Sequence, residues 1–87
     1  MWGPMNDDQL SAAAALVEQP SWTFFVKNSQ VTITDRFYRT HTFTFTQKRG
    51  RYRYTKPHAE MYSCEGPELH HLFRQIIVNW RTWFGIS

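Results

Sequence analysis

Residues 40–56 read THTFTFTQKRGRYRYTK, and the alternation of apolar and polar side chains along them is the clearest structural signal in the chain. A period of two is typical of a β-strand with one buried face. A loop with an even number of residues around Gly50 sorts Phe and Tyr onto one face and Thr and Arg onto the other. We expect the four-residue loop 47–50, because a two-residue loop sets Lys48 directly opposite Arg51.

The strand pattern extends upstream of this hairpin. Residues 31–46 also alternate, but sixteen residues exceed the usual strand length of about 5–6. Because Asp35 and His41 interrupt the apolar face, we expect two strands with a bend or bulge near residues 35–40. Residues 22–27 are rich in aromatic and β-branched side chains and end at a turn signal, which indicates a first strand. The stretch 57–65 reads as irregular, with an optional short edge strand at 60–63.

Two helices are expected to flank the sheet. Asn6 and Gln9 have the spacing of a capping box, and the apolar stripe that follows indicates a helix ending near Glu18. Pro67 suits the first position of a second helix, whose apolar residues recur at helical spacing until Gly85.

These elements predict a small α+β domain. We expect an antiparallel three- to four-stranded sheet with the N-terminal and C-terminal helices packed on one face, in the order α-β-β-β(-β)-α. Residues 1–5 are expected to form a flexible leader, and residues 6–87 a single domain.

Positive charge is concentrated in the middle of the chain. The 87 residues carry a net charge of +3, but residues 27–56 alone carry +7, between flanks of −3 and −1. The single cysteine, Cys64, argues against a disulfide-stapled secreted scaffold, so we expect a cytoplasmic or nuclear protein. No stretch approaches the roughly 20 apolar residues of a membrane span, so we expect no membrane partner.

The basic hairpin is the strongest candidate for a binding site. Lys and Arg neutralise phosphates, and Thr hydroxyls bind phosphate or sugar oxygens. The sequence therefore predicts a non-enzymatic nucleic-acid-binding module that contacts RNA or DNA backbone. The candidate binding residues are Lys48, Arg49, Arg51, Arg53, Lys56, Arg36, Arg39, Thr42, Thr44 and Thr46.

A protein partner is the alternative interpretation. The same arginines suit an acidic protein surface, as in a small interaction or inhibitor module of viral or phage type, with Trp83 as an interface residue. A homodimer formed through an edge strand is a further partner that the pattern allows.

The histidines and the cysteine predict no reaction. His41, His58, Cys64, His70 and His71 lack the paired spacing of a zinc site, and nothing supplies a third group beside Cys64 and His70. The chain also has no glycine-rich phosphate loop. We therefore expect no catalytic residues, no metal and no cofactor.

The element order α-β-β-β-α is similar to that of double-stranded-RNA-binding domains and of the Alu-RNA-binding subunits of the signal recognition particle. In the first family a lysine-rich start of the second helix binds the backbone, whereas this chain reads EGPE at residues 65–68. The second family uses the open face of its sheet. That resemblance implies a role for Thr42, Thr44, Arg51 and Arg53.

Overall fold

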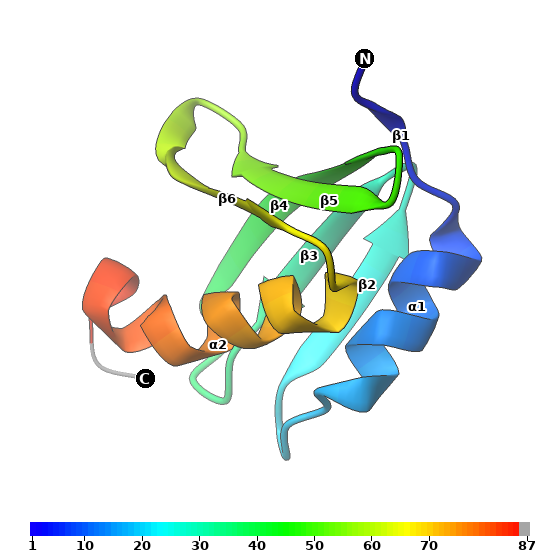
Figure 1. The fold of residues 1–87 in the computed structure, drawn as a ribbon. Helices are drawn as coiled ribbons and strands as arrows, with labels where there is room; N and C mark the ends of the chain where they lie inside the picture. Colours follow the sequence, from blue (N-terminus) through cyan, green and yellow to red (C-terminus); the bar gives the residue numbers. More distant parts are fainter. Residues whose placement is uncertain (86–87) are drawn as a thin grey trace.

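Eight elements follow one another in the computed structural model, which describes residues 1–85 (Figure 1). The α+β class, the antiparallel sheet and the two helices are confirmed, but the predicted three to four strands are too few. The last two residues of the predicted domain 6–87 lie outside the described residues. The elements are β1 (Gly3–Pro4), α1 (Asp7–Leu16), β2 (Thr23–Lys27), β3 (Gln30–Thr34), β4 (Thr40–Lys48), β5 (Arg51–Lys56), β6 (Ala59–Gly66) and α2 (Leu69–Phe84).

The sheet is an antiparallel meander in the order β2-β3-β4-β5-β6, with β1 added beside β4. The strand count exceeds the prediction because the chain after Pro57 turns back and pairs with β5 over most of its length, instead of staying irregular. Strands β2 and β6 are the edges of this path, and a homodimer through either stays a prediction. In the described chain, neither helix has the length and apolar character needed to span a bilayer.

The β4–β5 turn is shorter than predicted. Lys48 pairs with Arg51, so the loop contains only Arg49 and Gly50, and the four-residue loop is wrong. Both loop residues have positive φ, 46° and 79°, which is the geometry that matches the twist of a two-residue hairpin. This preference outweighs the repulsion between Lys48 and Arg51, whose side chains are exposed to water. The sorting of the two faces survives, because loops of two and four residues have the same parity.

Both helices pack on one face of the sheet and share its core (Figure 1). The pattern of residues 31–46 resolves into β3 and β4, joined by a turn at 35–39. The inward side chains Val31, Ile33, Phe43 and Phe45 are buried, as the alternation predicts, while the inward His41 and Gln47 are half-buried. The core contains Leu10, Ala13, Ala14, Val31, Ile33, Phe43, Phe45, Tyr54, Leu72, Phe73, Ile76 and Trp80.

The helix ends follow the capping signals with small shifts. The side chain of Asn6 accepts from backbone N–H groups of the first turn of α1, and Gln9 completes the capping box. Helix α2 begins two residues later than predicted, after Glu68 as N-cap. It stops at Gly85, whose φ is 92° and whose N–H donates to the carbonyl of Arg81 (2.9 Å).

Residues 1–5 contact the domain, although the sequence predicts a flexible leader. Gly3 and Pro4 pair with β4, and Met5 is buried. The N–H of Met5 donates to the hydroxyl of Ser29 (2.8 Å), which donates in turn to the carbonyl of Met5 (3.0 Å). The flexibility of this segment in solution stays a prediction.

Candidate nucleic-acid interface

The face of the sheet opposite the helices is polar and open to solvent. We call it the outer face. Its side chains alternate with the core residues along each strand, and cross-strand pairing places them in rows. It consists of Thr23, Phe25, Lys27, Gln30, Thr32, Thr34, Thr40, Thr42, Thr44, Thr46, Lys48, Arg51, Arg53, Thr55, Ser63 and Glu65.

Hydroxyl groups cover the middle of the outer face. The hydroxyls of Thr32 and Thr42 lie 3.0 Å apart, and those of Thr34 and Thr40 also lie 3.0 Å apart. In the next row the amide of Gln30 donates to the hydroxyl of Thr44 (3.3 Å). A hydroxyl has one proton and two lone pairs, so each paired threonine keeps hydrogen-bonding capacity for a ligand.

The cations gather at one end of the outer face. Lys48 and Arg51 are a cross-strand pair beside the turn, and Thr46 and Arg53 form the row behind them. Nη2 of Arg51 lies 3.5 Å from Oε1 of Glu65, but both side chains are about half exposed, so water screens this pair. The turn itself adds the exposed Arg49.

Trp2 packs over the same end. Its ring lies 4.3 Å from the guanidinium carbon of Arg53, which is a cation–π contact. Among the described residues, Nε of Arg53 is buried without a hydrogen-bond partner. Arg53 is therefore a half-buried cation whose guanidinium group is packed against the indole ring of Trp2.

Arg36 and Arg39 do not join the outer face. They lie in the β3–β4 turn, at the opposite end of β4 from Arg49. The guanidinium of Arg36 lies 5.0 Å from the Phe37 ring. Arg39 donates through Nε to Oδ2 of Asp35 (2.9 Å) and through Nη1 to the carbonyl of Phe84 (3.0 Å), so it holds the turn against α2.

Lys56 and Trp83 lie on the helix side of the sheet. Nζ of Lys56 is 5.8 Å from the ring of Phe43, a core residue. The ring of Trp83 lies 5.1 Å from that of Tyr62 and 6.4 Å from that of Tyr54. Of the ten predicted binding residues, the structure thus brings together seven: Lys48, Arg49, Arg51, Arg53, Thr42, Thr44 and Thr46.

Asp35 is the buried carboxylate that holds Arg39 in place. Its oxygens accept from the backbone N–H groups of Phe37 (2.8 Å) and Arg39 (2.9 Å) and from the indole N–H of Trp80 (2.9 Å). Burial by itself raises the pKa of Asp35, but these hydrogen bonds and the one from the Arg39 guanidinium outweigh it and hold the pKa below its usual value.

Sequence reasoning missed Phe25. This ring is 62% exposed on the outer face, whereas its neighbour Phe24 points inward toward Phe73, at a ring distance of 6.1 Å. Adjacent aromatic residues in one strand were the available signal, because strand geometry sends one of them to each face. Phe25 borders a hollow of about 280 Å³ that is also lined by Lys27, Asn28, Gln30 and Thr32.

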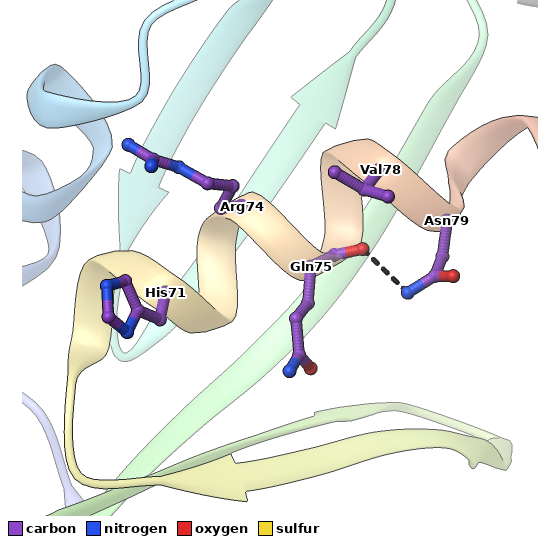
Figure 2. A pocket seen from close by; sticks show the side chains of 5 residues that line it. All are labelled: His71, Arg74, Gln75, Val78 and Asn79. Carbon is purple, nitrogen blue, oxygen red and sulfur yellow. Dashed lines mark hydrogen bonds between the residues drawn. The ribbon is translucent and has the colours of Figure 1, made fainter.

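A second hollow, of about 320 Å³, lies on α2 alone (Figure 2). Figure 2 shows the side chains of His71, Arg74, Gln75 and Val78 spreading away from the helix in different directions. Asn79 is engaged with its own helix, since its amide donates to the carbonyl of Gln75 (2.9 Å). This surface presents no converging set of polar groups.

No protein-family model, curated protein or solved structure matches this chain. Within residues 1–85, no three His, Cys, Asp or Glu side chains are grouped as metal ligands would be. Cys64 donates to the carbonyl of Glu65 (3.7 Å), and Nδ1 of His70 faces Glu68 at 3.6 Å, so these two groups have separate local partners.

Proposed function

We propose that this protein is a non-enzymatic nucleic-acid-binding module that contacts RNA or DNA backbone through the outer face and the β4–β5 turn. One observation carries the proposal. Lys48, Arg51 and Arg53 stand in adjacent rows at the end of a hydroxyl-covered face, with Arg49 at the turn beyond them.

The chemistry of this surface matches a phosphate backbone. Lys and Arg side chains release the counterions of a nucleic acid when they neutralise its phosphates, and hydroxyl groups add hydrogen bonds to phosphate and sugar. The outer face supplies both kinds of group in neighbouring rows. Its polar groups spread over several strands rather than converging on one point, which suits binding along a polymer better than chemistry on a small molecule.

The decisive measurement is salt-dependent binding. We expect a fluorescently labelled RNA or DNA of generic sequence to bind at about 50 mM salt and to lose affinity steeply by about 200 mM. Fluorescence anisotropy titrations measure both affinities. Absence of binding at the lower salt concentration, or an affinity that is independent of salt, overturns the proposal.

The variant Lys48→Glu/Arg51→Glu tests the location of the site. We expect it to fold, because both side chains are exposed, and to lose binding at both salt concentrations. Circular dichroism verifies the fold. A different outcome assigns the same surface to an acidic protein. In that case one protein co-purifies with this chain after nuclease treatment, and the purified chain does not bind nucleic acid.

A further inference from the structure

We propose that the outer face takes single-stranded rather than duplex nucleic acid, and that Phe25 is a platform on which an unpaired base stacks. The inference rests on the proposed function and deepens it. It adds a second kind of contact, base to aromatic ring, at the edge of the sheet away from the cationic turn.

Among residues 1–85, Phe25 belongs neither to the hydrophobic core nor to the partly buried side chains packed against it. It is 62% exposed on an edge strand, and its cross-strand neighbour on the outer face is the polar Thr32. Phe24 already supplies the aromatic contact of this strand with the core, through Phe73. Removal of an aromatic ring from water is favourable. A ligand that covers the exposed ring of Phe25 therefore gains binding free energy from its burial.

The surroundings of Phe25 fit a nucleotide. Lys27 follows at the next outward position of the strand, about 6.6–6.8 Å along it, within reach of the phosphate of a base stacked on Phe25. The hollow beside the ring is lined by Asn28, Gln30 and Thr32. Amide side chains carry donors and acceptors that complement base edges.

An unpaired base is the ligand that this arrangement selects. Bases in a duplex are stacked on one another, so only a splayed or single-stranded base offers a free face to an aromatic side chain.

A second aromatic ring stands near the cationic end of the same face. Trp2 lies on the guanidinium of Arg53 of β5, whereas Phe25 lies on the edge strand β2. The threonine rows separate the two rings. Rings at both ends with cations beside each of them, Lys27 and Arg53, form a track for a short single strand.

The test compares two single-stranded probes of about ten nucleotides, within the range of site sizes for such surfaces. One is a labelled oligothymidine, and the other is an abasic oligomer with the same number of phosphates. We expect Phe25→Ala to weaken binding of oligothymidine about 5- to 150-fold, the range measured for loss of one stacked base. Binding of the abasic oligomer is expected to stay within about twofold, because its phosphates meet the same cations.

Phe37→Ala is the matched control. Phe37 is also an exposed phenylalanine, at 51%, but it lies in the β3–β4 turn, so its removal is expected to change neither affinity. Phe25→Trp is expected to bind oligothymidine about as tightly as the wild type does, because tryptophan keeps a stacking surface. Equal losses with both probes, or no loss with either, overturn the stacking role of Phe25.

A duplex of the same sequence separates this inference from the proposed function. We expect the wild-type protein to bind the single strand more tightly than the duplex at equal salt. Duplex binding that equals or exceeds it overturns the single-strand inference and leaves the proposed function standing. Absence of binding to every probe, the abasic oligomer included, removes the proposed function itself.

Discussion

The two turns at opposite ends of β4 are both rich in arginine and use it in opposite ways. In the β3–β4 turn, Arg39 is held by the buried Asp35 and by the carbonyl of Phe84. At the β4–β5 turn, Arg49 and the adjacent strand residue Arg51 are exposed, and the contact of Arg51 with Glu65 is long and solvated. Two arginine-containing segments at the ends of one strand thus differ: the first holds its turn against α2, and the second leaves its cations available to a ligand.

The difference lies in what maintains each turn. The β3–β4 turn depends on side chains, because Asp35 accepts hydrogen bonds from the backbone of the turn and from Arg39. The β4–β5 turn depends on the backbone, since Gly50 adopts a φ of 79° at no steric cost. Because the conformation of the β4–β5 turn is set by its backbone, its side chains are not needed to hold the turn and are available to a ligand.

Asp35→Ala should produce the largest effect. It leaves the indole N–H of Trp80 and the guanidinium of Arg39 without their acceptor, and loss of one partner of a buried pair costs about 3–5 kcal/mol. The side chain of Arg39 is 32% exposed and regains some hydration, so we expect a loss of about 3 kcal/mol in the free energy of unfolding. Urea denaturation at neutral pH measures this loss.

Asp8→Ala is the control for removal of an aspartate. Asp8 is exposed in the first turn of α1, where a carboxylate interacts with the helix dipole for about 0.3–1 kcal/mol. If Asp35→Ala costs no more than Asp8→Ala, the β3–β4 turn does not depend on its carboxylate, and the contrast between the two turns fails.

The second effect concerns binding. Lys48→Gln/Arg51→Gln removes two cations from the outer face, and each phosphate contact with a single strand adds about 0.7 to the slope of log affinity against log salt. We therefore expect the salt dependence to become weaker, with the magnitude of this negative slope smaller by about 1.4. Titrations at several salt concentrations give the slope of each variant.

Arg36→Gln/Lys56→Gln is the matched control, with the same loss of charge. These two residues belong to the basic segment of the sequence, but Arg36 lies in the other turn and Lys56 beside the ring of Phe43. We expect their slope to stay near that of the wild type. A similar fall in both variants would show that the whole basic segment binds, without a distinction between the turns.

The alternation of residues predicts the faces of the sheet but not its extent. A period of two fixes which side chains share a face whatever the loop length, so the aromatic and hydroxyl-bearing faces follow from residues 31–56 alone. Strand β6 was predicted only in part, because its inward residues Tyr62 and Cys64 give a weak pattern. The four-residue loop is wrong because the positive φ angles of Arg49 and Gly50 favour a two-residue turn more strongly than the repulsion between Lys48 and Arg51 opposes it.

The candidate site was predictable for its cations only where local pairing decides their position. Lys48 and Arg51 follow from the hairpin, whereas the position of Arg39 depends both on the nearby Asp35 and on Phe84, 45 residues away in the sequence. Nothing near Arg39 signals the contact with Phe84. Phe25 was within reach of sequence reasoning, because Phe24 and Phe25 cannot both point into the core from one strand.

The smallest expected effect concerns His41, which lies beside the contacts that Arg39 makes with Asp35 and Phe84. His41 follows the β3–β4 turn, and its ring stacks on Phe84 with a centroid distance of 3.6 Å. Burial of the ring lowers the pKa of His41, and the charges of Lys56 and Arg39 lower it further, while Asp35 acts in the opposite direction. The net effect is a pKa of His41 below its ordinary value of 6.5 in the folded protein. The unfolded chain therefore takes up a proton at a higher pH than the folded protein does.

The contribution of His41 to stability is therefore fully present above pH 6.5 and is lost as the pH falls through the lowered pKa. His41→Phe keeps an aromatic ring against Phe84 and removes the titration. Urea denaturation between about pH 7 and pH 5 should show a loss of stability in the wild type that is smaller in His41→Phe. His71→Gln, at an exposed position on α2, should keep the wild-type loss. Identical pH profiles for the wild type and His41→Phe would mean that neither burial nor the charges of Lys56 and Arg39 lower the pKa of His41 in the folded protein.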